Sequence, residues 1–584
     1  MKSLYPLIPY LKSQKVKLIL GTIFVSISIF LQSMYPLVIG NAVDEISKGT
    51  TEVSYLNYAL LSVGLILLGG VFLFLTRRTI IVASREIEND LRRDFFSHLQ
   101  NLPKSFYDKN TTGDLMAHAT NDISNIRNFL GPGIMYSIQT FLRTVVTLII
   151  MFSIAVKLSL IALIPLPLIS ILVYKVMKSV YGRSQRVQEA FSGLTTKVQE
   201  NFSGIRVMKS YVREDSEIEH FNKVSADYQS KSLSLARIQS YSFPMMFLLT
   251  GLSIILVIYF GGVDVINGKL TLGNVTEFMV YLGQLTFPMI AFGWVINLVQ
   301  RAAPSMDRLM KIRNTEPEIK NNESINDEIE EEDITGSIEF KNVSFKYDGT
   351  DNYILKNINL KIKNGSSLGI IGHTGCGKTT LINLIPRIYD TAEGEIKVNG
   401  FNIKDIPLEL LRNSIGVVPQ ESFLFSDSIE NNIGYSSDTI DEENLIKSSQ
   451  LAGLYKDVNL FPNKFKTVVG ERGVTLSGGQ KQRTSIARAI YKTPKILILD
   501  DSLSAVDTNT EEEILKGLKE VMKERTTIII SHRISTLKNL DKIIVLNNSV
   551  IAEQGTHDEL LELKGIYYNI HIKQLLEEEI EEMQ

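Results

Sequence analysis

Long apolar runs fill the first half of the chain, and short apolar runs separated by turns fill the second half. Before about residue 302, six runs are almost free of charge: 18–43, 53–76, 128–156, 158–174, 238–263 and 278–300. Each is close to the roughly 20 residues that a helix needs to cross a bilayer. The first run is too long for a cleaved signal peptide and lacks a small-residue cleavage site. The pattern predicts six transmembrane helices.

Basic residues predict the orientation of these helices. Four lysines precede the first run, and the segments 77–127 and 175–237 carry eight and eleven Lys and Arg. The other three loops each hold a single lysine, namely Lys48, Lys157 and Lys269. Since basic loops stay on the cytoplasmic side, we expect a multi-pass protein of the cell membrane with both termini and the second half of the chain in the cytoplasm.

The pattern changes abruptly after Arg313. Residues 314–333 are polar and acidic, as a solvated linker would be. Further on, the "SIEFKNVSFKY" segment alternates like a half-buried strand, "EIKVNGFNI" predicts a hairpin at Asn-Gly, and "KILILD" and "TTIIIS" suit buried strands. We predict a transmembrane domain over 1–312, a linker over 313–336, an α/β domain over 337–574 and an acidic tail over 575–584.

Size and composition agree with two unlike domains. The chain has 584 residues and a net charge of −3, and its length exceeds that of a single ordinary domain. Cys376 is the single cysteine, which excludes an intramolecular disulfide and a cysteine-cluster metal site. The six apolar runs exclude a soluble ATPase of the chromosome-maintenance type, and we expect no nucleic-acid partner.

The segment "GHTGCGKTT" fits the phosphate-loop pattern G-x-x-x-x-G-K-[ST] and follows an apolar strand. Its glycines let backbone amides curl around phosphate oxygens, while a lysine and a hydroxyl reach the phosphates and magnesium. We expect a helix over "LINLIPRIY" to follow the loop. The residues predicted to bind ATP here are Gly372, Thr374, Gly375, Cys376, Gly377, Lys378, Thr379 and Thr380.

A second anion site is predicted at "LSGGQKQR", which begins with Leu476. The free amides at the start of a helix suit the γ-phosphate of ATP. A simple Ser-Gly-Gly helix cap is the alternative, but this segment stands about 100 residues after the phosphate loop and about 20 before a strand that ends in Asp-Asp. The residues concerned are Ser477, Gly478, Gly479 and Gln480.

Together, "GHTGCGKT", "VVPQ", "LSGGQ", "ILILDD", "SAVD" and "SHR" resemble, in this order and spacing, the nucleotide-binding domain of an ABC transporter. Six spans followed by that domain resemble a half-transporter of the bacterial multidrug-exporter type. The resemblance implies a six-span α-helical transmembrane domain fused to an α/β P-loop domain of the ABC ATPase type. It also implies ATP and Mg²⁺ as cofactors, and transport-coupled ATPase activity.

The resemblance implies roles for further residues. It matches Tyr347 to the aromatic that stacks on adenine, Asp500 to the metal-side carboxylate, and His532 to the residue that contacts the γ-phosphate. Gln420 matches the glutamine that reaches magnesium and the attacking water, which gives Thr379, Gln420 and Asp500 as expected metal ligands. Asp507 matches a loop that crosses to the other nucleotide domain, and "VVGERG" (468–473) matches a segment that touches the membrane domain.

The family's nucleotide domains face each other head to tail, so each ATP lies between the phosphate loop of one and the LSGGQ helix of the other. The chain departs from the family pattern at Asp501, where hydrolysing members carry Glu. Asp is one methylene shorter, and a general base must come within about 3 Å of its water. With its intact LSGGQ, the chain resembles the degenerate subunit of heterodimeric exporters, and we expect a partner that carries Glu. A slow homodimer is the alternative.

The two long cytoplasmic stretches are predicted to end in short helices that lie against nucleotide domains, and the candidates for these helices are Lys109–Asp122 and Gly204–Asp215. Tyr211, in the second, is a candidate for insertion into a groove on the partner. Arg143 is the strong polar anomaly within a span; it contacts cargo, pairs with an acidic residue or snorkels to the membrane surface. A set of flexible and aromatic residues could line a cavity or simply pack: Met245, Met246, Met279, Met289, Phe287 and Trp294.

The sequence thus predicts ATP-driven export of amphipathic small molecules, without naming the cargo. A peptide or lipid exporter is one alternative, and a non-transporting regulator gated by ATP is another.

Overall fold

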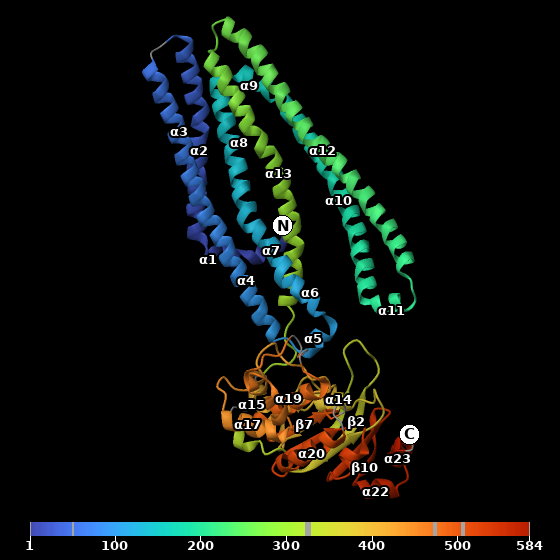
Figure 1. Ribbon diagram of the computed structural model, residues 1–584. Coiled ribbons are helices and arrows are strands. Elements are labelled where there is room, and N and C mark those ends of the chain that lie inside the picture. Colours follow the sequence, from blue (N-terminus) through green and yellow to red (C-terminus); the bar gives the residue numbers. More distant parts are fainter. Residues whose placement is uncertain are drawn as a thin grey trace. The chain divides into compact units, whose positions relative to one another are not determined.

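The computed structural model describes residues 2–49, 52–321, 329–470, 473, 476–503 and 508–582. It divides into two compact units (Figure 1). Unit 1 contains Met1–Gln100 and Thr112–Thr315, and unit 2 contains Asn101–Thr111 and Glu316–Gln584. The short segment Asn101–Thr111 therefore packs with the second half of the chain, although it lies within the first half of the sequence.

Unit 1 is helical. Its helices are α1 (Ile8–Ser13), α2 (Lys15–Ser47), α3 (Glu52–Thr76), α4 (Val82–Gln100), α6 (Thr112–Ala117), α7 (Ile123–Asn128), α8 (Ile134–Ile154), α9 (Val156–Leu163), α10 (Pro165–Ser203), α11 (Ile205–Ser210), α12 (Glu214–Ile266) and α13 (Leu272–Arg313). Three π-helical turns join neighbouring helices, at Arg77–Ile81, His118–Asp122 and Phe129–Gly133.

Within the described residues, five helical segments are long and apolar enough to cross a membrane: Lys15–Ser47, Tyr55–Gln100, Thr112–Ile154, Phe247–Ile266 and Leu272–Arg313. They correspond to five of the six expected spans. The remaining one, 158–174, is divided between α9 and α10 at Pro165, because proline starts a helix well but cannot continue one. Several side chains of that segment lie outside the described residues.

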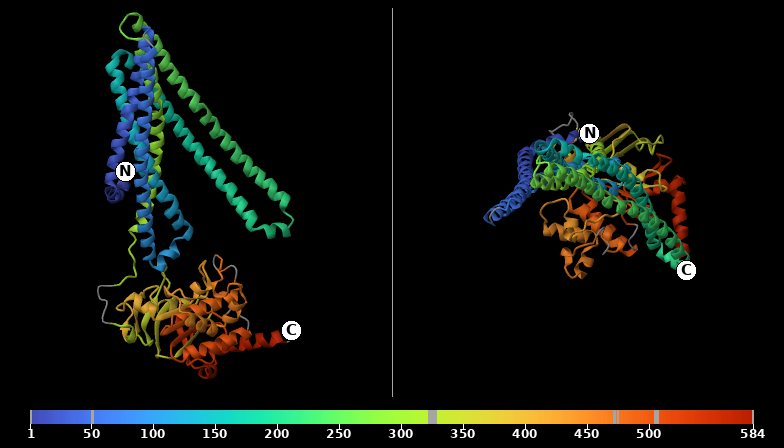
Figure 2. Two further views of the ribbon diagram at one scale, coloured as in Figure 1. Left: turned by 60° about the vertical axis from the view of Figure 1, so that its left-hand side comes forward. Right: turned by 90° about the horizontal axis from the view of Figure 1, so that it is seen from above.

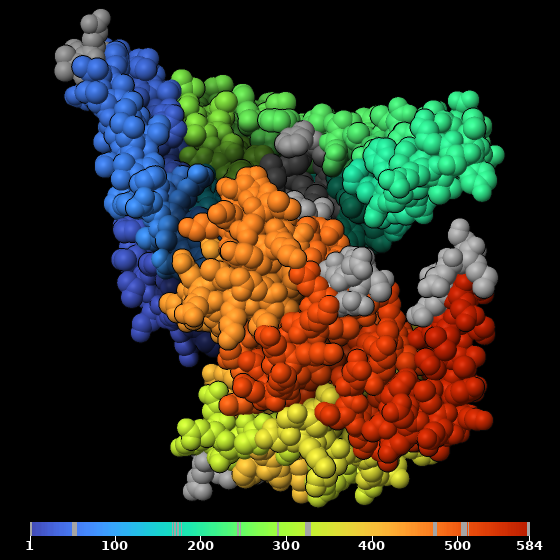
Figure 3. All heavy atoms as spheres, turned by 60° about the horizontal axis from the view of Figure 1, so that its bottom comes forward, coloured from blue at the N-terminus to red at the C-terminus, as the bar shows by residue number. Residues whose placement is uncertain are grey.

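Helices α10 and α12 pack side by side as a long hairpin closed by α11, and α2 packs along α3 (Figure 1). The hairpin diverges from α3 and α4 toward its α11 end, as the side and top views agree (Figure 2). The green and teal surface of the hairpin likewise stands apart from the blue surface of the first helices (Figure 3). The α11 end therefore has few neighbours within its own unit.

A buried carboxylate holds the short helices α6 and α7 to the end of α13. Asp122 accepts hydrogen bonds from Ser305 (2.8 Å) and Arg308, while His118 Nδ1 lies 2.7 Å from its Oδ2. Because Asp122 is buried and its oxygens are matched by donors, removing a partner would leave an uncompensated buried charge. This network links the last turns of α13 to the segment that contains α6 and α7.

Unit 2 contains two sheets. The antiparallel sheet has the order β2-β1-β4-β5, with β1 (Ile338–Phe345), β2 (Leu355–Ile362), β4 (Glu393–Val398) and β5 (Phe401–Asn402). The larger sheet has the order β10-β9-β3-β8-β7-β6, with β3 (Ser367–Ile371), β6 (Ile415–Val418), β7 (Ile496–Asp500), β8 (Thr526–Ile530), β9 (Lys542–Asn547) and β10 (Val550–Gly555).

In the larger sheet, β9, β3, β8, β7 and β6 run parallel, so their carboxyl ends meet at one edge. The strands β7 and β8 are fully buried, as their apolar sequences predict. The expected hairpin at Asn399–Gly400 is confirmed, because both residues have positive φ (51° and 86°) between the paired strands β4 and β5.

The helices of unit 2 are α5 (Lys104–Lys109), α14 (Lys378–Asn383), α15 (Leu408–Asn413), α16 (Ile429–Ile433), α17 (Glu442–Leu451), α18 (Tyr455–Leu460), α19 (Gly478–Tyr491), α20 (Thr508–Met522), α21 (Ile534–Leu537), α22 (His557–Glu562) and α23 (Ile566–Glu582).

The helix expected over "LINLIPRIY" is too long. It ends at Asn383 and is followed by turns, because Pro386 has no amide hydrogen and its ring clashes with the preceding turn. Arg387 then takes a left-handed conformation (φ 53°), and its buried guanidinium pairs with Asp390 (2.8 Å). The early end of α14 directs Tyr389 back toward β1.

Candidate functional site

The loop between β3 and α14 is shaped to enclose a small anion. Gly375 and Gly377 have φ of 83° and 99°, and a Cβ at Gly377 would stand 3.0 Å from the Ile354 carbonyl oxygen. Glycine is therefore required there. The buried Lys378 Nζ donates to the carbonyl oxygens of Gly372 (2.8 Å) and His373 (3.0 Å), so its charge lies inside the loop.

Two oxygen groups from different elements meet beside this loop. Thr379 Oγ1, at the start of α14, donates a hydrogen bond of 2.8 Å to Asp500 Oδ2 at the end of β7. The pairing of β7 with β8, and of β8 with β3, brings these groups together from 121 positions apart. The structure thus joins two of the three expected metal ligands.

Burial raises the pKa of Asp500, the nearby Asp501 carboxylate raises it further, and Thr379, Lys378 and His532 act in the opposite direction. Only 3% of Asp500 is exposed. A hydroxyl and a buried carboxylate are hard oxygen ligands, which suit Mg²⁺ when phosphate oxygens and water complete its shell. The donor set therefore fits magnesium.

The expected adenine-stacking residue lies next to the phosphate loop. Tyr347 follows β1, and its hydroxyl lies 2.9 Å from Thr380 Oγ1 on α14. Its ring packs edge to face on Phe345 and Tyr389, with centroids 5.0 and 5.4 Å apart. Tyr347 is only partly buried, which leaves part of its surface available to an adenine ring.

The Tyr389 hydroxyl donates a hydrogen bond of 2.6 Å to Asp108 Oδ2 on α5. Burial acts to raise the pKa of Asp108, but hydrogen bonds from Lys104 and Tyr389 lower it below its ordinary value. Burial and the Asp108 contact both raise the pKa of Tyr389. Rings and hydrogen bonds therefore run continuously from α5 to Thr380, within unit 2.

Three more predicted residues lie at the carboxyl edge of the large sheet. Gln420 follows β6 with its side chain exposed, and His532 follows β8 with its side chain exposed. Asp501 directly follows β7 with φ of 45°, and its amide donates to the Ile530 carbonyl oxygen (3.0 Å). All three lie at the strand ends that border Thr379 and Asp500.

The LSGGQ helix is capped but stands apart from the phosphate loop. Ser477 Oγ accepts from the Gln480 amide (3.3 Å) and Gln480 Oε1 accepts from the Ser477 amide (3.1 Å), a capping box at the start of α19. Gln480 Nε2 also donates to Asp457 Oδ1 (3.3 Å). Within the described ranges, no hydrogen bond or ion pair joins Ser477–Gln480 to residues 372–380.

Asp507 lies outside the described residues, as do Glu471 and Arg472 of the "VVGERG" segment. Their predicted roles stay predictions.

Tyr389, Asp108 and Glu511 were not predicted from the sequence. Glu511 is buried, accepts a hydrogen bond from Thr536 Oγ1 (2.7 Å) and pairs with Arg533, so it ties α20 to the segment that begins with His532. In the sequence Glu511 stands in a run of three glutamates and resembles any exposed helix charge. Tyr389 was not predicted because the sequence was expected to form a helix over 381–389, whereas α14 ends at Asn383.

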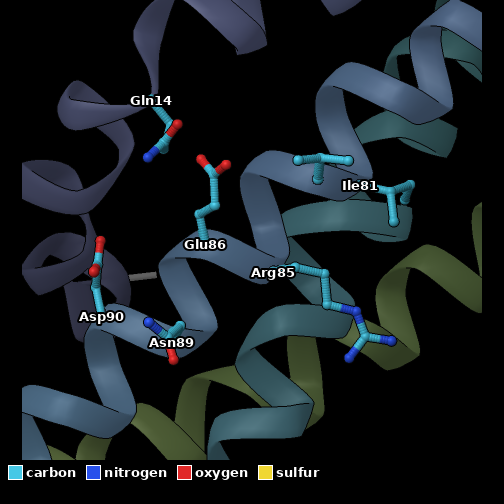
Figure 4. A pocket seen from close by; sticks show the side chains of 7 residues that line it. Gln14, Ile81, Arg85, Glu86, Asn89 and Asp90 are labelled. Carbon is cyan, nitrogen blue, oxygen red and sulfur yellow. The ribbon is translucent and has the colours of Figure 1, made fainter.

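A pocket of about 500 Å³ lies elsewhere, in unit 1, between the Gln14 turn and α4 (Figure 4). Glu86 points to the Gln14 side of this pocket and pairs with Lys17, whereas Arg85 points away. It contains none of the predicted site residues. Its charged contact holds the α1–α2 junction against α4.

The sequence matches two families, the ABC transporter transmembrane region over residues 18–289 and the ABC transporter family over residues 355–504. It is 37% identical to a probable multidrug resistance ABC transporter ATP-binding/permease protein, YheI, of Bacillus subtilis, over 93% of this chain and 92% of that protein. It is 34% identical to an ATP-dependent lipid A-core flippase of Syntrophus aciditrophicus, over 85% and 82% of the two chains.

The fold also matches a solved structure, that of a bacterial Atm1-family ABC exporter with ATP bound. The TM-score is 0.78 at 26% identity, over 97% of this chain and 98% of that chain.

Changing Asp500 to Asn tests the magnesium site. Asn keeps an acceptor for Thr379 but removes a negative charge from a buried position, so the Tm of the nucleotide-free protein should be unchanged or higher. Because the pKa of Asp500 is raised in the folded protein, ionising this group lowers the free energy of unfolding as the pH rises above the ordinary pKa of aspartate. Affinity for a fluorescent ATP analogue should fall at least about tenfold with Mg²⁺ present and stay nearly constant without it.

The matched control is Asp438→Asn, an exposed carboxylate of the same unit. Unchanged affinity for the magnesium complex in Asp500→Asn would show that Asp500 is not a ligand.

Proposed function

Because the chain belongs to the ABC transporter family, with a membrane region fused to an ATP-binding domain, we propose that it is half of an exporter for amphipathic, drug-like molecules. Exporters of this family work as dimers, and their ATPase activity is coupled to transport. The observation that carries the proposal is that the phosphate loop after β3 and Asp500 at the end of β7 lie at one edge of the larger sheet. The 2.8 Å hydrogen bond from Thr379 to Asp500 joins them.

In this proposal Lys378 and the loop amides bind the phosphates, while Tyr347 stacks on adenine. Thr379, Asp500 and Gln420 would hold Mg²⁺, which would neutralise charge on the phosphates. His532 contacts the γ-phosphate. The hydrogen bonds of Lys378, Tyr347 and Thr379 support the roles of these residues. The position of Gln420 and His532 at the same sheet edge supports theirs.

The site lacks one wall in the single chain, which supports a dimer. The start of α19 makes its hydrogen bonds with Asp457 and within its own cap, and none with the phosphate loop among the described residues. Helix α19 has 14 residues, and the backbone amides at its capped start can bind an anion. A second chain that turns its own α19 toward this phosphate loop would complete the site.

Exposed apolar side chains on the α10–α12 hairpin support the same conclusion. Around α11, Tyr211 and Val212 are 75% and 82% exposed, and Phe202 and Val207 are also exposed. Such a patch costs free energy in water and marks a contact surface. We assign it to the nucleotide domain of the partner chain, with Tyr211 inserted there.

We further propose that the partner differs from this chain and carries Glu where this chain has Asp501. A shorter carboxylate stands farther from the water that it must activate, and a displacement of about 1 Å costs on the order of 100-fold in rate. The chain would then bind ATP at its own phosphate loop, hydrolyse it slowly and lend its LSGGQ helix to the partner's faster site.

The cargo would bind among α2, α8 and α13, where polar and aromatic side chains are brought together. Arg143 Nη2 donates to Gln32 Oε1 (2.6 Å), and no acidic residue within the described ranges pairs with Arg143. Tyr136 packs edge to face on Trp294, with centroids 5.2 Å apart. Tyr136 and Arg143 are seven residues apart on α8, so they lie on the same side of that helix about two turns apart. An aromatic pair and, among the described residues, a cation without an acidic partner would suit amphipathic molecules with an acidic group.

The similar proteins include both a probable multidrug transporter and a lipid flippase, so an acidic lipid is the second candidate cargo. By the positive-inside distribution of Lys and Arg, unit 2 and both termini lie in the cytoplasm.

Changing Asp501 to Glu should raise the ATPase rate of the full chain, purified alone and dimeric, by at least about tenfold. The added methylene extends the carboxylate toward the water position, while the chain's own LSGGQ helix is intact. Asp501→Asn is the control and should leave the low basal rate within about twofold. Vigorous hydrolysis by the unmodified chain, at roughly 1 to 10 per second and lost in Asp501→Asn, would refute the degenerate site.

Changing Tyr389 to Phe should separate ATP hydrolysis from transport. The ring still packs on Tyr347, but the hydrogen bond to Asp108 is lost, and bonds to charged groups contribute about 1.5–3 kcal/mol. In vesicles that contain the complete dimer, dye transported per ATP should fall about tenfold while nucleotide affinity changes less than twofold. The control is Tyr353→Phe, which removes an exposed hydroxyl bonded to Glu393. Equal losses in both variants would show that the Tyr389–Asp108 hydrogen bond does not couple ATP hydrolysis to transport.

Changing Arg143 to Gln should weaken stimulation of the ATPase by acidic amphipaths, with an increase of about tenfold in the half-maximal concentration. Stimulation by neutral or cationic amphipaths should change little, and so should the unstimulated rate. The control is Arg237→Gln, which removes an arginine from α12 in the same unit. If acidic and cationic compounds are affected alike, Arg143 acts in helix packing and not in cargo recognition.

A further inference from the structure

A second group of carboxylates lies in unit 1, where the last turns of α2 meet the first turns of α13, at the end of the bundle farthest from α11 (Figure 1). Glu277 of α13 is only 3% exposed, and its Oε2 atom has no hydrogen-bond partner among the described residues. Asp44 of α2 lies close by and accepts a hydrogen bond from the Gly273 amide through Oδ1 (2.7 Å).

The two helices are shaped to enclose the Glu277 carboxyl. A Cβ at Gly40 would overlap this carboxyl, and a Cβ at Gly273 would overlap the Gly40 carbonyl and the Asp44 carboxyl. Both glycines are buried. Their missing side chains therefore create the space in which Glu277 lies against the α2 backbone.

Among the described residues, no positive charge compensates the carboxylates of Glu277 and Asp44. Within the described ranges, no Lys, Arg or His lies within 4.0 Å of Glu277 or Asp44, and the nearby Lys48 pairs with Glu45 (3.8 Å). The other polar groups that face Glu277 are the neutral Asn274 amide and Tyr281, whose hydroxyl donates to the Ser33 carbonyl oxygen (2.8 Å). An ionised Glu277 would be a buried, unpaired anion beside a second carboxylate, which costs several kcal/mol.

We infer that Glu277 is a proton-binding site that couples the packing of α2 on α13 to pH. When the two helices are packed, the side chain is a neutral carboxylic acid. When it loses its proton, the carboxylate needs water, and water reaches it only if α2 and α13 separate. A metal cation fits less well, because it needs about six oxygen ligands and one Asp44 oxygen already accepts the Gly273 amide.

The proton itself can be observed by infrared difference spectroscopy. Near neutral pH, the spectrum of the full chain in lipid nanodiscs minus that of Glu277→Gln should contain the carbonyl stretch of one protonated carboxylic acid. Any band from the buried Asp500 is common to both spectra and cancels. The matched control is Asp307→Asn, an exposed carboxylate on the same helix, which should keep the Glu277 band. A spectrum of Glu277→Gln that equals the unmodified protein's would overturn the proposal.

The coupling can be measured with two spin labels. Cys376 is the single cysteine, so Cys376→Ala followed by Ser47→Cys and Leu272→Cys labels the exposed ends of α2 and α13 specifically. As the pH rises, the ratio of molecules with separated labels to molecules with close labels should increase by up to about tenfold per pH unit. This is the limit for one linked proton. Glu277→Gln should remain packed at every pH.

The proposal is overturned if Glu277→Gln keeps the pH dependence, or if separation follows Na⁺ or Ca²⁺ concentration at constant pH. No nucleotide is present in either experiment. A negative result therefore leaves the proposed ATP chemistry untouched, and failure of the ATPase predictions leaves this proposal untouched.

Discussion

The hydrogen bond between Thr379 and Asp500 is the contact on which the nucleotide site depends. It exists because β3, β8 and β7 run parallel and end at one edge, so that a loop and a carboxylate 121 positions apart meet there. The same edge receives Gln420, Asp501 and His532 from the ends of β6, β7 and β8. Any change in strand register would move these groups apart together, since side chains alternate between faces.

The nucleotide site is connected to Asn101–Thr111, the segment of unit 2 that comes from the first half of the sequence. Tyr347 contacts the phosphate-loop helix on one side and Tyr389 on the other, and Tyr389 contacts Asp108 on α5. A ligand that stacks on Tyr347 therefore rests on a cluster whose far end is a helix from the membrane half of the sequence. Unit 1 has its own rigid connection, since Asp122 ties α6 and α7 to the end of α13.

Much of this could be predicted from the sequence, because apolar runs and glycine loops have local causes. The five spans, the buried strands β7 and β8, the Asn399–Gly400 hairpin and the Thr379–Asp500 edge follow from such patterns. Tyr389, Asp108, Glu511 and Glu277 could not be predicted as functional, since their importance comes from contacts made across long sequence distances. The sequence shows Glu277 as an ordinary charge near a helix start, and only the packing reveals that its Oε2 atom has no hydrogen-bond partner among the described residues.

We propose above all that this chain binds ATP at its own phosphate loop and hydrolyses it slowly, while a second chain completes the site. The most direct test is photolabelling of the assembled dimer with azido-ATP carrying the label on either the α- or the γ-phosphate. The account predicts that this chain keeps the γ-label through many turnovers while its partner keeps only the α-label. Loss of the γ-label from both chains at the same rate would contradict it.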